Sequence, residues 1–145
     1  MEKINFSIKI NSPKEKVWSV LFDDVTYRLW TSVFTPGSYA VTDWKEGSKA
    51  LFLDGSGNGL VSTIAKNVPN KFLSINHLGF VKDGVEDTES DAVKDWAGAI
   101  ENYTLIEDRD ITELKVDMDS TNEYKDYFSK TWPKALEIIK ELSEK

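Results

Sequence analysis

The sequence predicts an α+β domain in which a curved antiparallel sheet of about six or seven strands wraps around one long C-terminal helix. Three observations lead to this fold class. The chain begins with a strictly alternating stretch, Ile4 to Ile10. Its middle contains further alternating stretches separated by Gly, Pro, Asn and Asp, a pattern typical of hairpins. From Ser120 to Leu142, apolar residues recur every three or four positions, which is the period of an amphipathic helix.

The N-terminal part predicts one strand followed by two short helices. The alternation of Ile4 to Ile10 gives a strand with one buried face. Ser12 fits a helix N-cap, Pro13 fits the first helical position, and Glu15 completes a capping box. A second short helix is expected to start near Asp24, after an acidic interruption.

The middle of the chain predicts a series of strands joined by short turns, which makes neighbouring strands antiparallel. Pro69-Asn70 is a hairpin signal, and Lys82-Asp83-Gly84 is a turn. The acidic segment from Glu86 to Asp95 is expected to be a loop with a short helix. The expected strands are Ser38–Asp43, Lys49–Leu53, Leu60–Val68, Phe72–Val81, Trp96–Glu107 and Thr112–Met118.

The final helix is expected to cover the apolar face of the sheet, because no other element is large enough. Ser120 and Glu123 fit a capping box at its start. Pro133 removes one helical hydrogen bond, and we favour one helix bent there because the apolar stripe keeps its phase. The alternative is two helices, the second capped by Thr131. The stripe consists of Tyr124, Tyr127, Phe128, Trp132, Ala135, Ile139 and Leu142.

Length and composition limit the classes of function. A chain of 145 residues fits a single domain, residues 1–145. A net charge of −7 repels phosphate backbones, so no nucleic-acid partner is expected. The chain has no cysteine, no apolar run long enough to insert into a membrane, and no signal-peptide pattern at its start. A cytoplasmic protein is the expected default.

His77 is the only histidine, so a metal site built from several histidines and cysteines is excluded. It lies in phase with Leu73 and Ile75 on an expected strand. We interpret it as a core or cavity-wall residue that hydrogen-bonds a neighbour, and a polar anchor for a ligand is the alternative. No catalytic residue, metal or cofactor is predicted.

Two other segments resemble functional motifs only superficially. The Gly55–Gly59 loop lacks the ending of a phosphate-binding loop and is interpreted as a hairpin turn. The acidic residues of Asp87–Asp91 alternate as in a calcium loop, but Ala92 stands where glycine is required. Asp117 and Asp119 share one side of a strand and are expected to face water.

Five Trp, five Tyr and seven Phe predict an interior rich in aromatic rings. These rings either fill the core or line a cavity for a small apolar molecule, which would have mostly apolar walls and a few polar groups. In the second case His77, Tyr103 and Tyr127 are the polar groups. The candidate cavity residues are Trp30, Phe34, Trp44, Phe52, His77, Trp96, Tyr103, Tyr127, Phe128 and Trp132.

Three parts of the chain carry a resemblance to a known family: Ile10–Trp18 with Tyr27–Trp30, Gly37–Tyr39 with Trp44–Ser48, and Thr131–Leu136. In this order and spacing they resemble the START-like superfamily, whose helix-grip fold is shared with the birch-pollen allergen. Within it, the chain is similar to homologues of the activator of heat-shock-protein-90 ATPase. The resemblance covers nearly the whole chain and implies the helix-grip fold. Members of the superfamily include ligand carriers, cyclases and co-chaperone domains.

The expected function is binding of a small hydrophobic ligand, neutral or weakly polar, in a cavity between the sheet and the final helix. A cyclase or hydrolase is one alternative, and it requires His77 and a carboxylate to converge in the cavity. A co-chaperone-like interaction module with a chaperone partner is the other, and it requires an exposed apolar patch over a filled core. A binding module ranks above an enzyme, and the expected state is a monomer or a weak dimer.

Overall fold

The computed structural model describes residues 1–145, in which eight strands and four helices form one α+β domain. Along the chain they are β1 (Glu2–Ile10), α1 (Lys14–Phe22), α2 (Asp24–Thr31), β2 (Tyr39–Val41), β3 (Lys49–Leu53), β4 (Gly59–Val68), β5 (Phe72–Lys82), β6 (Val85–Asp87), α3 (Asp91–Lys94), β7 (Ile100–Asp108), β8 (Ile111–Ser120) and α4 (Asn122–Glu144).

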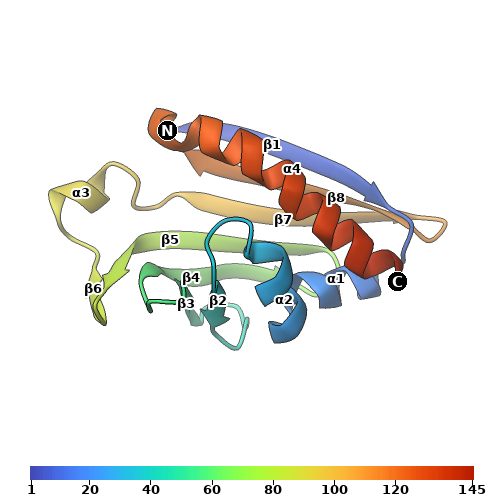
Figure 1. Cartoon of the computed structure of the whole chain (residues 1–145), viewed down its shortest axis with the longest axis horizontal. Helices are drawn as coiled ribbons and strands as arrows, with labels where there is room; N and C mark the ends of the chain where they lie inside the picture. Colours follow the sequence, from blue (N-terminus) through green and yellow to red (C-terminus); the bar gives the residue numbers. More distant parts are fainter.

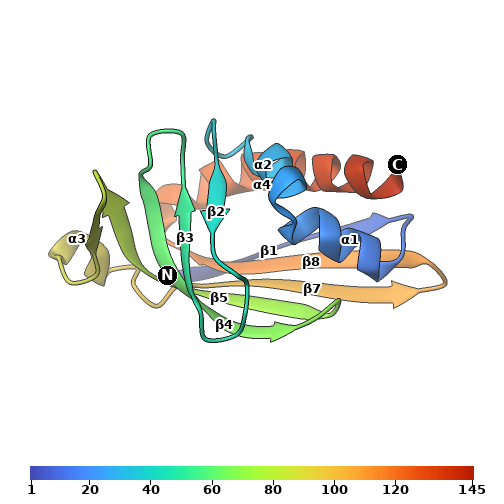
Figure 2. The same ribbon diagram turned by 90° about the horizontal axis from the view of Figure 1, so that it is seen from below.

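All strands belong to one antiparallel sheet in the order β1-β8-β7-β5-β4-β3-β2, with β6 paired to β5. Helix α4 crosses one face of this sheet, with its C-terminal end near α1 (Figure 1). Figure 2 shows α1, α2 and α4 on the same side, and the sheet bends so that β2 and β3 rise steeply beside α2. This is the helix-grip architecture that the sequence predicts.

The pairing of β1 with β8 explains how the alternating pattern becomes a buried face. Ile4 lies opposite Met118, Ile8 opposite Leu114, and Ile10 opposite Thr112. Because side chains alternate across a strand, this register turns one apolar set from each strand toward α4. Ile10 and Leu114 are completely buried there.

The two halves of α4 have different surroundings. In the C-terminal half, Trp132, Ala135, Leu136 and Ile139 are buried in the main core. In the N-terminal half nearly every residue is exposed, and Tyr124, which belongs to the expected stripe, is 53% exposed. The apolar stripe therefore packs firmly only from about Trp132 onward.

Pro133 lies inside α4, which runs without interruption from Asn122 to Glu144. The alternative of two helices is therefore wrong. Thr131 does not cap a second helix, because its hydroxyl donates to the Tyr127 carbonyl one turn earlier, at 2.7 Å.

Three local expectations need correction. The N-cap of α1 is Pro13 rather than Ser12, whose carbonyl instead accepts a hydrogen bond from the Thr112 hydroxyl at 2.7 Å. Ser120 belongs to β8, and Thr121 caps α4 without a side-chain hydrogen bond. The strand expected from Trp96 begins only at β7, since residues 95–98 form a turn after α3.

The sheet also has one strand more than expected, namely β6. It lies at the start of the segment expected to be an acidic loop, and it pairs Glu86 with Val81 of β5. The short helix expected in the same segment is present as α3.

Trp132→Ala should strongly destabilise the protein. Trp132 is only 2% exposed, its ring contacts those of Trp30 and Phe34, and its Nε1 donates to Met118 Sδ at 3.1 Å. Removing a buried aromatic side chain costs about 3–5 kcal/mol, so the melting temperature should fall by about 10 °C or more. Tyr124→Ala, in the exposed half of α4, is the control and should change it by no more than a few degrees. Equal effects of the two substitutions would contradict this account of α4.

Candidate functional site

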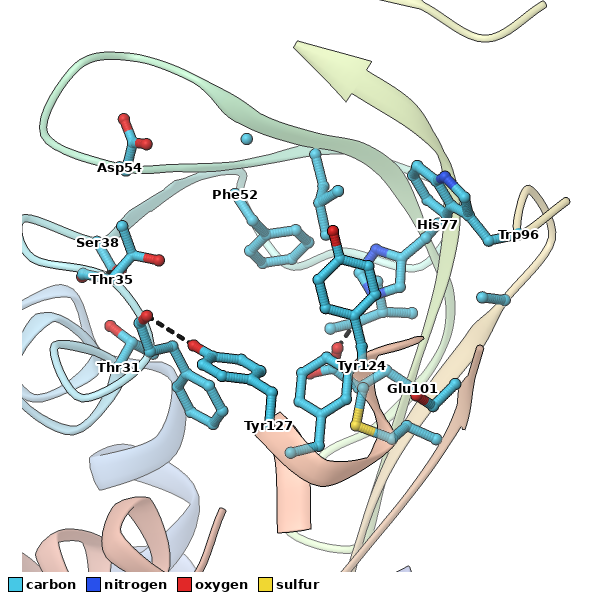
Figure 3. Close-up of a pocket in the computed structure, with 18 of the residues that line it drawn as sticks. Thr31, Thr35, Ser38, Phe52, Asp54, His77, Trp96, Glu101, Tyr124 and Tyr127 are labelled. Carbon is cyan, nitrogen blue, oxygen red and sulfur yellow. Dashed lines mark hydrogen bonds and ion pairs between the residues drawn. The ribbon is translucent and has the colours of Figure 1, made fainter. Parts of the chain in front are cut away.

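A cavity of about 430 Å³ lies beneath the N-terminal half of α4. Its other walls come from α2 and the loop after it, and from the inner face of β3, β4, β5 and β7. Of the 29 residues that line it, 18 are hydrophobic, so its walls are mainly apolar. The close-up in Figure 3 shows Phe52, Tyr124 and Tyr127 converging on this space from opposite sides. The cavity exists because the half of α4 that covers it does not pack against the sheet.

Aromatic rings in mutual contact form most of the cavity wall. Trp132 lies at the inner end, with ring centroids 4.9 Å from Phe34 and 5.9 Å from Trp30. On the sheet side, the Phe52 ring lies 6.0 Å from that of His77. The candidate residues from the sequence that line the cavity are Trp30, Phe34, Phe52, His77, Trp96, Tyr103, Tyr127, Phe128 and Trp132.

Trp44 is the one candidate residue that lies outside the cavity lining. Its backbone has a left-handed conformation, φ 62°, and Asn67 Nδ2 donates to its carbonyl at 2.8 Å. The ring consequently packs behind Phe52 and against Phe22, with centroids 5.9 and 4.9 Å away. Trp44 therefore supports the wall from the core side instead of facing the cavity.

The rim of the cavity is partly exposed and is held by few contacts. Tyr127 is 40% exposed, and its hydroxyl donates to the Phe34 carbonyl at 2.6 Å, which links α4 to the loop after α2 (Figure 3). Trp96 lies at the far end against Phe80, with ring centroids 4.6 Å apart. Gly37, with φ 75°, approaches Gly55 so closely that a Cβ would lie 2.8 Å from its Cα. Only glycine fits at position 37, where the two loops of the rim come into contact.

A chain of polar side chains closes the cavity at its base. His77 Nδ1 lies 2.7 Å from the Ser62 hydroxyl oxygen, and His77 Nε2 lies 3.0 Å from Glu101 Oε1. The Tyr103 hydroxyl donates to Glu101 Oε2. His77, Glu101 and Tyr103 line the cavity, whereas Ser62 is completely buried behind them. One carboxylate, held from two sides, therefore faces an otherwise apolar space.

Glu101 is ionised near neutral pH. Burial alone would raise the pKa of this carboxyl, but the hydrogen bond and charge of His77, together with the Tyr103 hydrogen bond, hold it below its usual value. Burial, followed by the charge of Glu101, raises the pKa of both Tyr103 and Tyr27, so these phenols stay protonated. An ionised carboxylate can only accept hydrogen bonds, so Nε2 of His77 carries the proton.

The sequence analysis missed Glu101 and Tyr27, although both line the cavity. Glu101 lies two residues before Tyr103 and four before Leu105, which are buried on the same face of β7. In the sequence, the signal that could have identified Glu101 is its position in the same alternating set as Tyr103 and Leu105. Tyr27 lies three residues before Trp30 on α2, and their ring centroids are 5.3 Å apart.

The remaining acidic candidates have structural partners. Asp87 accepts hydrogen bonds from the backbone of Glu89 and Ser90, at 3.2 and 3.0 Å, and so forms a turn. Asp117 pairs with Lys3 at 3.2 Å, and Asp119 accepts from the backbone of residue 100 at 3.0 Å. No three carboxylate or imidazole side chains converge as a metal site would require. None of the helices has both the length and the hydropathy needed to cross a bilayer.

Comparison with known proteins agrees with this architecture. The sequence profile of the family described as Activator of Hsp90 ATPase homolog 1-like protein matches residues 11–144. The chain belongs to this family. No curated protein sequence matches the chain directly.

Several solved structures share the fold of this chain at low sequence identity. Protein MLL2253 from Mesorhizobium loti is 16% identical, with a TM-score of 0.74 over 97% of this chain and 96% of that one. The Aha1 dimer from Colwellia psychrerythraea is 19% identical, with a TM-score of 0.71 over 99% and 97%. CalU16 from Micromonospora echinospora is 18% identical, with a TM-score of 0.67 over 97% and 74%. These likenesses show that the chain shares their fold.

Glu101→Gln should reduce the loss of unfolding free energy that occurs as the pH becomes acidic. Because the folded pKa of Glu101 lies below its ordinary value of 4.5, folding favours the ionised carboxylate. That stabilisation is complete above the ordinary value and disappears as the pH falls through the lower folded pKa. Between about pH 5 and about pH 3, the wild type should therefore lose more free energy of unfolding than the variant, measured by urea denaturation. Glu137→Gln, at an exposed position of α4, should follow the wild type, and parallel curves for wild type and Glu101→Gln would refute this role.

Proposed function

We propose that the protein binds a small ring compound in the cavity between the sheet and the N-terminal half of α4. The observation that carries this proposal is an apolar cavity of about 430 Å³ with one polar cluster at its base. Ligand pockets commonly have this composition and a volume of roughly 300–1,000 Å³. Bulky rings from α2, β3 and α4 leave the space open because planar side chains on a bent sheet do not fill every gap.

The size of the cavity sets the expected affinity. A ring compound that buries roughly 200–300 Å² of apolar surface gains about 5–7 kcal/mol, at ~25 cal/mol per Å². Association costs several kcal/mol in lost translational and rotational freedom. Because 1 mM corresponds to about −4 kcal/mol, this apolar term alone gives a dissociation constant in the millimolar range, and hydrogen bonds at the polar base would tighten it.

An enzyme is a weaker proposal, although His77 and a carboxylate do converge in the cavity as that alternative requires. Both ring nitrogens of His77 are already engaged, one by Ser62 and the other by Glu101. Ser62 is completely buried and has no access to a substrate. The lowered pKa of Glu101 makes it a weak base at neutral pH. These contacts support a structural and binding role for the polar cluster.

A co-chaperone-like module is the other alternative, and the family name refers to Hsp90 ATPase activation. Val25 and Leu29, one turn apart on the outer side of α2, are 72% and 49% exposed, and they are the apolar pair that a protein partner would contact. This alternative expected a filled core, whereas a cavity of about 430 Å³ lies beside the packed core. The cavity therefore favours ligand binding, while a chaperone partner and a monomer or weak dimer stay predictions.

The proposal is tested by titrating the protein with flavonoids, sterols, fatty acids and an apolar dye, followed by tryptophan fluorescence and NMR chemical shifts. At least one compound should give a saturable response, with shifts confined to cavity residues such as Trp30, Phe52 and Phe128. The absence of any saturable response would refute ligand binding in this cavity.

Ala99→Phe should weaken binding of the same dye by about tenfold or more, because its added ring occupies cavity volume in a densely packed interior. Ala99 is buried and lines the cavity, whereas Ala97, two residues earlier, is exposed and outside it. Ala97→Phe adds the same ring and should leave the affinity unchanged. Melting curves check that both variants are folded, and equal dye affinities would place the dye elsewhere.

A further inference from the structure

Acidic side chains outnumber basic ones in the cavity lining. Glu101, Asp54 and Asp119 line the cavity, and His77 is the only basic side chain among the lining residues. Asp54 lies on the wall across from Glu101 in Figure 3, and its Oδ1 accepts from the backbone of Ser56 at 2.8 Å. Glu101, at the base, is therefore the acidic group that a ligand among the aromatic walls would meet.

The Glu101 carboxylate retains unused capacity to accept hydrogen bonds. Oε1 accepts from His77 Nε2, and Oε2 accepts from the Tyr103 hydroxyl. A carboxylate offers about four lone-pair positions, so two donors leave about two of them free. Because Glu101 lines the cavity, a hydrogen-bond donor of a ligand bound there could reach these free positions.

Aromatic rings lie near the two residues, His77 and Tyr103, that hold this carboxylate. The Phe52 ring lies 6.0 Å from His77 and 6.4 Å from Tyr27, and the Trp30 ring lies 6.3 Å from Tyr103. The faces of such rings carry partial negative charge and attract cations within about 6 Å. Rings and carboxylate therefore favour the same sign of charge in a ligand.

We propose that the ligand is an arylalkylamine, whose protonated amino group donates to Glu101 while its ring system lies among the aromatic walls. This inference rests on the proposed function and specifies its ligand class. Burial of an ammonium is costly unless it is paired and hydrogen-bonded, and Glu101 supplies both. A ligand carboxylate at the same place would be repelled by Glu101, and a hydroxyl could donate a hydrogen bond but would bring no charge of opposite sign.

The expectation of a neutral or weakly polar ligand therefore changes. That expectation follows from the net charge of −7, and it places the polar end of the ligand near His77 or Tyr103. Both of them donate to Glu101, which leaves the carboxylate as the group that determines the charge of the ligand.

The test uses three compounds with the same naphthalene body: 2-naphthaleneethylamine, 2-naphthaleneethanol and 2-naphthaleneacetate. Calorimetric titration at neutral pH gives each dissociation constant for the wild-type protein. The ammonium should bind about tenfold or more tightly than the alcohol, as charge-assisted hydrogen bonds and cation–π contacts predict, and the carboxylate should bind most weakly. The ammonium should also shift the NMR signals of the Phe52 ring.

Glu101→Gln tests whether this carboxylate causes the preference. The variant should bind the ammonium no better than the alcohol, whereas Glu137→Gln, which removes the same charge from the surface, should keep the wild-type ratio. The ratio of the ammonium and alcohol dissociation constants is also measured for the wild-type protein. The inference can therefore be tested even if the Glu101→Gln variant does not fold.

The outcomes separate this inference from the proposed function. If the alcohol or the carboxylate binds as tightly as the ammonium, the arylalkylamine inference is wrong and ligand binding stands. If the ratio survives Glu101→Gln in folded protein, the inference is also wrong. If neither these compounds nor the wider panel bind, both proposals fail together.

Discussion

The position of the final helix depends on how Trp132 is packed. Its ring contacts those of Phe6 on β1, Trp30 on α2, Phe34 in the following loop and Tyr103 on β7. These four residues come from distant parts of the sequence and belong to both the sheet and the helical layer. The contacts that the Trp132 ring makes with these four residues therefore fix the distance between the sheet and the helices. The part of α4 that precedes Trp132 does not pack against the sheet. The cavity is the space between that part of the helix and the sheet.

Buried polarity is confined to one place in this cavity. Ser62, His77, Glu101 and Tyr103 satisfy one another, so a charge is tolerated where an isolated one would be strongly disfavoured. The bulges that β4 and β5 contain near Ser62 change the pairing of the strands, and Ser62 lies opposite His77 in the resulting register. The irregular part of the sheet is thus the part that assembles the polar base.

Much of the fold could be predicted from the sequence because periodicity is a local property. The alternation of Ile4–Ile10 and the stripe of α4 gave the layers and their buried faces. The acidic strand β6 was missed because its three residues carry no alternating apolar pattern. Ser12 looked like a helix cap, but a hydrogen bond from Thr112, 100 positions away, determines its role. A hydrogen-bond partner so far away in the sequence cannot be inferred from the spacing of neighbouring residues.

The candidate site shows the same limit. Nine of the ten candidate residues line the cavity, but no local pattern indicates which way the ring of Trp44 turns. Its left-handed backbone directs it to the other side of Phe52. Glu101 was overlooked because a carboxylate on a strand is usually solvated. Its ionised state in this partly buried position depends on His77, 24 positions away.

The two halves of α4 have consequences for how this protein changes over evolution. The buried apolar residues from Trp132 onward secure the fold, and polar replacements of them would remove core packing. Residues before it are largely exposed yet include Tyr124 and Tyr127, which border the cavity. Substitutions at such surface positions usually alter stability by less than about 0.5 kcal/mol. Within one continuous helix, a tolerant segment that shapes the cavity adjoins a constrained segment that maintains the domain, so new ligand preferences are accessible by mutations that leave folding intact.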